Sequence, residues 1–322
     1  MRKTLIFILI SSLLVTAVSC RETPDETSYA SDVIPEDGFD PHVYSELYDE
    51  NFDAATKQAF FSFCDALLAG EDEFDCPDYV TFYNVSNTVS HQCMPLSYFV
   101  DDGACSVSGG KGHIVYTIPR EEYMEKVEAF KDIVTSMLDE CIKDGYSDTD
   151  KALAIYHFFE EHYVYDYYAA ENDDVRLSPF RLFYEQKGIC QEIAPAYAYM
   201  LLQAGVECTT CGSLNASNDA HEWAVAKLDG RYYHIDPTWA VCDPGTLRYF
   251  GMTDDQRVAE GGWERSVFNY GEANIFDTRG ELSCVDSKFA PLWVSQTYEI
   301  DYEADRISYY TADDPEEQSF MY

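Results

Sequence analysis

Basic residues are scarce in this sequence. The 322 residues include 21 lysines and arginines against 59 aspartates and glutamates, so the formal net charge is −38 at pH 7. A surface of this charge repels a phosphate backbone, which excludes nucleic acid as a partner. The charge identifies no other partner, and we interpret it as the acidic, solvated surface of an exported protein.

Repeats and metal-binding motifs are also lacking. The sequence shows no internal repeat, and its acidic clusters do not have the spacing of a calcium-binding loop. The pair Cys208 and Cys211 has metal-like spacing, but no second such pair exists and the pair falls in an apparent strand. Buried or disulfide-bonded cysteines are the simpler interpretation. We therefore predict no metal and no cofactor.

The apolar run near the start is short. Leu5 to Val15 has fewer than the ~20 residues that a membrane-spanning helix needs, and it lies between two basic residues and several small ones. This order is typical of a signal peptide. The run AVSC, which ends at Cys20, resembles a bacterial lipoprotein box, and this resemblance implies cleavage before Cys20 and a lipid on its sulfur. Its alanine stands where leucine is usual, so plain secretory cleavage is the alternative.

The composition divides the chain into segments. Residues 21–40 are acidic and bury too little apolar surface to offset the entropy of ordering, so they are expected to form a tether. We expect the protein to be lipid-anchored at the cell surface, with no other membrane contact, or else secreted. The five expected segments are a lipoprotein signal peptide (1–20), the tether (21–40), an N-terminal α/β region without an assigned role (41–118), a core (119–262) and a β-rich extension (263–322).

Hydrophobic spacing and turn residues predict an α+β fold, because helices come first and an antiparallel sheet follows. Helices are predicted at 53–70, 119–145, 147–168 and from Cys190 onward. Strands are predicted at 79–89, 112–118, 206–213, 221–228 and 231–236, with two more in 295–314.

The stretch GICQEIAPAYAYMLLQAG, residues 188–205, places Cys190 at the start of a nearly all-apolar helix. The helix dipole and the unpaired backbone N–H groups at such a position favour the thiolate, which is the nucleophilic form of cysteine. A cysteine nucleophile also needs a base and a group that orients the base.

A predicted hairpin supplies two such groups. Asp229-Gly230 is a typical two-residue turn between the strands 221–228 and 231–236. His221 then faces a residue near position 238, and Asp236 faces one near 223, so the two lie on neighbouring strands about two places apart. Diagonal neighbours of this kind are ~7–8 Å apart at the backbone and can join through long side chains.

The motifs GICQ and HEWAVAKLDGRYYHIDPTWA together resemble the core of the transglutaminase-like superfamily over roughly residues 147–252. The resemblance implies a papain-like fold, with a central buried helix packed on an antiparallel sheet. It also implies that Cys190 is the nucleophile, His221 the base and Asp236 the orienting acid.

Further residues complete the predicted site. The backbone N–H of Cys190 is one candidate donor to an oxyanion, and the resemblance suggests Tyr165 as a second. Gln191, Trp223 and Trp239 are substrate-site candidates, although core packing is the simplest role for the two tryptophans.

Two residues depart from the family pattern. Pro195 is expected to disturb the first turns of the helix, because it lacks an N–H and crowds the carbonyl of Gln191. Glu192 is expected to raise the pKa of the Cys190 thiol unless its carboxylate points to solvent.

The resulting function is a cysteine peptidase or amidase that acts on a peptide or protein, with cell-wall peptide as one option. The alternatives are a transglutaminase with an amine acceptor and a non-catalytic surface binding protein. Hydrolysis is favoured because water is always present, whereas transfer to an amine needs extra architecture. The sequence does not predict the oligomeric state.

Overall fold

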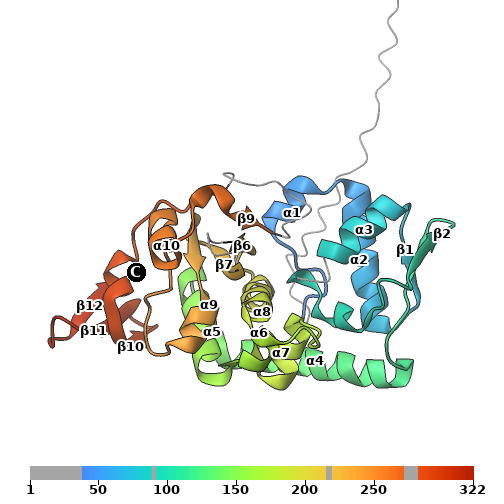
Figure 1. The fold of residues 1–322 in the computed structure, drawn as a ribbon. Helices are drawn as coiled ribbons and strands as arrows, with labels where there is room; N and C mark the ends of the chain where they lie inside the picture. Colours follow the sequence, from blue (N-terminus) through green and yellow to red (C-terminus); the bar gives the residue numbers. More distant parts are fainter. Residues whose placement is uncertain (1–37, 89–91, 215–219, 272–281) are drawn as a thin grey trace, which may run out of the picture. The chain divides into compact units, whose positions relative to one another are not determined.

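The computed structural model describes residues 38–88, 92–214, 220–271 and 282–322 (Figure 1). The predicted signal peptide, Cys20 and nearly all of the predicted tether lie outside these ranges, so they remain predictions, as do the segment boundaries. Within the described ranges, none of the helices combines the length and the apolar character that crossing a membrane requires. The described part is a mixed α+β fold whose larger sheets are antiparallel, as predicted.

The N-terminal region is built on helix α2 (Ala54–Ala69), which confirms the helix predicted there and is capped by Asp53. Its other elements are α1 (Glu46–Asn51), α3 (Tyr79–Thr88), the 3-10 helix η2 (Pro95–Phe99) and a small sheet of β1 (Glu73–Asp75), β3 (Lys111–His113) and β2 (Ser106–Ser108), in that order.

The strand predicted at 79–89 is wrong, because most of this segment forms helix α3. The side chain of Asp78 accepts a hydrogen bond from the backbone N–H of Thr81 and so caps the helix. Phe82 and Val85 are buried, three residues apart, on the face that packs inward. This cap and this burial outweigh the β-branched and aromatic composition.

The strand predicted at 112–118 is shorter than expected, since β3 ends at His113 and only an isolated bridge at Tyr116 follows.

Two predicted helices follow. Helix α4 (Arg120–Cys141) begins after Pro119 and ends before the predicted Gly145, and α5 (Asp148–His162) begins with a capping box between Ser147 and Asp150. The chain then forms β4 (Val164–Tyr165), α6 (Tyr167–Glu171), α7 (Pro179–Glu185), β5 (Lys187–Gly188) and α8 (Cys190–Gln203). The helix predicted at 147–168 therefore ends earlier than expected.

The central sheet has the order β8-β7-β6-β9, with β6 (Cys208–Leu214), β7 (Ala220–Leu228), β8 (Arg231–Ile235) and β9 (Asn269–Tyr270). Asp229 and Gly230 have φ angles of 50° and 80°, as a type I′ hairpin turn requires. Leu228 pairs with Arg231, which confirms the predicted hairpin register. The short strand β9 comes from a part of the sequence for which no strand was predicted.

The C-terminal part comprises α9 (Pro237–Cys242), α10 (Asp254–Gly261), the 3-10 helices η3 (Arg265–Val267) and η4 (Ala290–Val294), and a sheet of β10 (Ser295–Asp301), β11 (Arg306–Thr311) and β12 (Gln318–Met321). The first two of these strands were predicted and the third was not. Tyr298 donates a hydrogen bond to Glu160, and Tyr322 donates one to Asp150, both at 2.5 Å. These contacts fasten the C-terminal sheet to α5.

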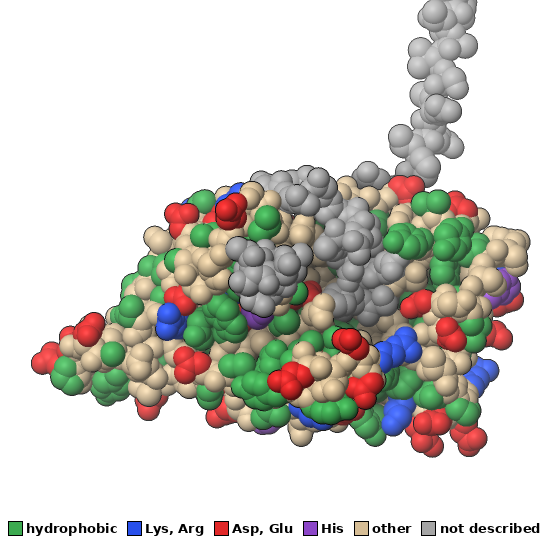
Figure 2. Space-filling view, in the orientation of Figure 1, with side chains coloured by type: hydrophobic (Ala, Val, Ile, Leu, Met, Phe, Trp, Pro, Cys, Tyr) green, Lys and Arg blue, Asp and Glu red, His purple; other side chains and the backbone are tan. Residues whose placement is uncertain are grey.

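Helix α8 lies at the centre of the core. It packs against β7, β6, α5, α7 and α9, and Figure 1 shows it among these elements. All of its side chains except that of Gln191 are buried, which confirms the predicted buried helix. Figure 2 shows acidic side chains spread over the visible face rather than gathered in one patch, as expected for a solvated acidic surface.

Candidate active site

The start of α8 is held close to its neighbours by Gly188. A Cβ atom at this position would meet Leu182 at 3.0 Å and the Cβ of Glu192 at 3.1 Å. Gly188 also pairs with Tyr165 in the parallel β4–β5 ladder, and its carbonyl accepts a hydrogen bond from the N–H of Asp166. A side chain at 188 would therefore crowd Leu182 on α7 and Glu192 in the first turn of α8, the turn that begins with Cys190.

Glu192 does not point to solvent. Its carboxylate is fully buried and accepts hydrogen bonds from Nε and Nη2 of Arg181 and from the backbone N–H groups of Ser178 and Ile189. The predicted effect of Glu192 on the Cys190 thiol remains a prediction. The Arg181 guanidinium compensates the Glu192 charge, and these contacts fix the start of α8.

Arg181 also holds Asp166, at 2.8 Å. Its hydrogen bond is the main cause that lowers the pKa of Asp166 to about 2. Arg181 thus joins α7, α8 and the N-cap of α6 through two carboxylates. The sequence reasoning missed Arg181, although Ser178-Pro179 is a typical helix start and would have predicted α7.

Pro195 does not interrupt α8. The helix runs without a break from Cys190 to Gln203, with Pro195 buried at its sixth position. The expected disturbance of the first turns is therefore absent. Since α8 packs against neighbours on all sides, tertiary contacts offset the loss of one helical hydrogen bond.

His221 lies at the start of β7, and its Nε2 donates a hydrogen bond to Oδ2 of Asp236 at 2.7 Å. An ionised carboxylate only accepts hydrogen bonds, so Nε2 carries a proton. Nδ1 is therefore the ring nitrogen that can exchange a proton with the Cys190 thiol. Asp236 caps α9, and its Oδ1 accepts from the backbone N–H groups of Thr238 and Trp239. The β7–β8 hairpin thus brings the imidazole and the carboxylate into direct contact.

The charges of this pair favour an imidazolium. Burial lowers the pKa of His221, but the charge and hydrogen bond of Asp236 raise it, and so do the hydrogen bond and charge of Cys190, with a net value of about 9. Burial raises the pKa of Asp236, but His221 and Arg257 outweigh it and the pKa is lowered. Asp236 is therefore an anion at neutral pH. The arrangement can hold a thiolate beside an imidazolium, which is the reactive form of a cysteine nucleophile.

The remaining predicted residues differ in exposure. Gln191 is exposed, Trp239 is partly exposed and Trp223 is fully buried. Trp223 therefore packs in the core next to the site and does not reach a substrate. Tyr165 is half-buried, and burial followed by the charges of Cys190 and Cys242 raises its pKa to about 12. Its hydroxyl therefore keeps its proton and can donate a hydrogen bond.

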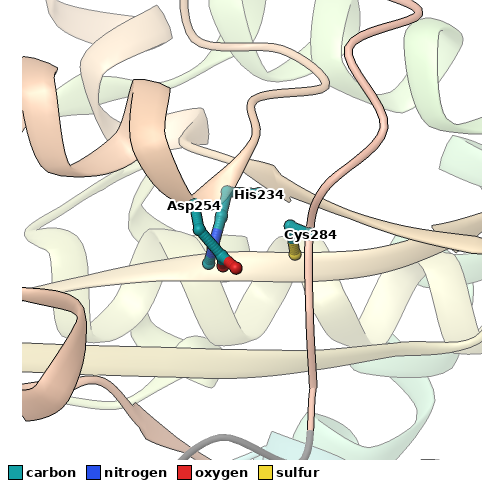
Figure 3. A group of neighbouring side chains, drawn as sticks. All are labelled: His234, Asp254 and Cys284. Atoms are coloured by element: carbon teal, nitrogen blue, oxygen red, sulfur yellow. The ribbon is translucent and has the colours of Figure 1, made fainter.

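A second group of side chains lies behind Trp223. His234, Asp254 and Cys284 place one possible ligand atom each within 4.8 Å of the others, and Figure 3 shows the His234 ring against the Asp254 carboxylate. The Trp223 indole N–H donates to Nδ1 of His234, whose Nε2 donates to Asp254 at 3.0 Å, and Arg265 lies 2.7 Å from the other oxygen.

These contacts do not fit a metal ion. An ion bound to Nε2 would displace the hydrogen bond to Asp254, while Nδ1 must stay unprotonated to accept from the indole. The ion would also lie close to the Arg265 guanidinium, which already occupies one Asp254 oxygen. We interpret the group as a hydrogen-bonded support for Trp223.

Known proteins resemble this chain over part of its length. The chain is 29% identical over 136 residues to the Kyphoscoliosis peptidase of Homo sapiens, which covers 37% of this chain and 21% of the relative. The same-named protein of Mus musculus is 27% identical over 133 residues, covering 36% and 20%. The chain thus spans about a fifth of the length of these relatives.

A solved structure described as that of a TGase matches at 16% identity and a TM-score of 0.30, covering 42% of this chain and 43% of the other. The family model described as the Transglutaminase-like superfamily matches residues 135–237. This match includes Cys190, His221 and Asp236. Residues 135–237 of this chain are therefore similar to the Transglutaminase-like superfamily.

Proposed function

We propose that the protein is a thiol acyl-enzyme hydrolase, a cysteine peptidase or amidase, that acts on peptide or protein amides. One observation carries the proposal: Cys190 opens the buried helix α8 beside His221, whose other ring nitrogen is bonded to the buried Asp236. This arrangement supports the roles of nucleophile, base and orienting acid for the three residues.

The chemistry follows from these positions. The Cys190 thiolate attacks the amide carbonyl carbon and forms a C–S bond, while the oxyanion accepts hydrogen bonds from the Cys190 N–H and Tyr165. The C–N bond breaks as His221 gives its proton to the leaving amine. Water then gives a proton to His221 and attacks the thioester, a C–O bond forms, the C–S bond breaks and the thiolate is restored.

Two considerations support hydrolysis over transfer to an amine. Water is available without further architecture, whereas an amine acceptor needs a place that holds it and excludes water. The matching relatives are named peptidases, although they match over only part of their length. We further propose that the enzyme is exported and lipid-anchored, and that its substrate is a surface or cell-wall peptide.

The test is mass spectrometry of the purified protein after incubation with a mixed peptide library, with and without a primary amine. We expect new cleavage products that depend on Cys190 and are absent for Cys190→Ala. Mass gains equal to the added amine on glutamine would instead establish a transglutaminase. No change in any peptide, with Cys190 also inert to alkylating reagents, would contradict both forms of acyl transfer and favour a binding protein.

A further inference from the structure

Arg257, on helix α10, is a buried cation that lies against Asp236. Its side chain is completely buried, although arginine is seldom buried without partners. Its Nη2 lies 3.1 Å from Oδ2 of Asp236, the oxygen that also accepts from His221. Among the described residues, none of its three guanidinium nitrogens has a partner in hydrogen-bond geometry. Charge attraction is therefore the main interaction between Arg257 and Asp236.

Three indole rings enclose the guanidinium. Its central carbon lies 4.3 Å from the ring centroids of Trp223 and Trp239 and 4.4 Å from that of Trp263. We call these three residues the indole cage. Indole offers the strongest cation–π contact among the side chains, and the contact strengthens when water is excluded. The cage thus compensates a buried charge that lacks hydrogen bonds.

The indole cage is itself held in place and reaches the base. Trp223 is fixed by its hydrogen bond to His234, which is bonded to Asp254 at the start of the same helix α10. The rings of Trp239 and Trp263 stack on the imidazole of His221, with centroids 5.3 and 5.5 Å away. The cage therefore touches both Arg257 and the His221 ring.

We propose that Arg257 is a positioning residue for the proposed acyl transfer: held by the indole cage, it fixes the Asp236 carboxylate against His221. The inference rests on the proposed function for its role in turnover. Removing the guanidinium frees one side of Oδ2, so the carboxylate loses the contact that locates it opposite the imidazole. Removal also takes a cation away from the neighbourhood of the imidazolium.

The largest charge effects on Arg257 come from Asp236, Cys211, Glu260 and Tyr249. The largest charge effects on His221 come from Asp236 and Cys190. The Arg257 cation lies at the same Oδ2 of Asp236 as His221 and opposes the imidazolium charge. Its loss removes this repulsion, while the backbone N–H groups of Thr238 and Trp239 still hold the Asp236 anion nearby, so the pKa of His221 is expected to rise.

The test compares Arg257→Met, which fills the cage without charge, and Arg257→Lys, which keeps a cation there. Arg306→Met removes an exposed arginine on the C-terminal sheet and is the control. We expect kcat/KM to fall about 10- to 100-fold for R257M with little change in KM, and Arg257→Lys to restore most of it. We also expect the pKa of His221 in R257M to rise by about 0.5–1 unit in a nuclear magnetic resonance titration, with the ring assigned from His221→Ala.

The titration needs no substrate, so it separates this inference from the proposed function. If wild type turns over no peptide, the proposed function fails while the titration still tests the contact with Arg257. An unchanged His221 pKa and unchanged turnover in folded R257M would overturn the inference, because a merely structural arginine would affect only stability. If R257M does not fold, Arg257→Gln removes the charge but keeps a polar side chain in the cage. An upward shift of the His221 pKa in that variant supports the inference, and no shift overturns it.

Discussion

Asp236→Asn is expected to lower kcat/KM by about 10²- to 10⁴-fold. The reason is that every neighbour of this carboxylate presents a proton or a positive charge. Oδ1 accepts from two backbone N–H groups, and Oδ2 faces His221 and Arg257. An asparagine must direct its NH₂ group at one of these two sets of donors. The site therefore requires aspartate, even though an amide oxygen alone could accept from His221.

The pH profile of this variant provides a second readout. His221 must be protonated to stabilise the thiolate and to protonate the leaving amine, so activity is lost as pH rises through its pKa, about 9 in the wild type. Asp236→Asn removes the charge that raises this pKa while burial still lowers it. The alkaline limb of kcat/KM should therefore move to lower pH.

Asp243→Asn is the matched control, since Asp243 is exposed at the other end of the same short helix. We expect its activity to stay close to that of the wild type. An Asp236→Asn enzyme with near wild-type kcat/KM and an unmoved alkaline limb would contradict the assignment of Asp236.

Arg181→Met is expected to lower the free energy of unfolding by about 3–5 kcal/mol. The substitution leaves the completely buried Glu192 without its cation, while Asp166 keeps only the half-exposed Lys187 at 3.4 Å. Chemical denaturation at pH 7 measures the loss. Because Glu192 fixes the first turn of α8, we also expect reduced alkylation of Cys190 in the folded fraction.

Two further variants sharpen this test. Arg306→Met removes an exposed ion pair with Asp301 and should cost at most about 1 kcal/mol. Arg181→Met combined with Glu192→Gln removes one uncompensated charge and should recover part of the stability. A loss in Arg181→Met no larger than that in Arg306→Met would contradict the role given to the buried cluster.

The sequence predicted the parts of this site that depend on local rules. The Asp229-Gly230 turn determined the hairpin register, and that register places His221 and Asp236 on adjoining elements. The apolar run after Cys190 predicted the buried helix. These inferences needed only the side-chain repeat of a strand, about two residues, the repeat of a helix, about 3.6 residues, and one turn preference.

The residues that the sequence did not predict act across the fold. Arg181 and Arg257 neutralise carboxylates that lie 11 and 21 positions away in the sequence, and no local pattern links a cation to its distant partner. The pairing of Glu192 was not predicted for the same reason, since its cation comes from another helix. The strand predicted at 79–89 was wrong because composition was given more weight than the cap at Asp78.

The most direct test of the account is the alkylation rate of Cys190 at pH 7, followed by peptide-resolved mass spectrometry in the wild type and in His221→Ala. Cys242, the exposed cysteine among those described, is the internal reference. We expect Cys190 to react at least about tenfold faster than Cys242 despite its burial, and the alanine variant to lose this advantage. Equal rates for the two cysteines, or a Cys190 rate unaffected by the loss of His221, would contradict an activated nucleophile.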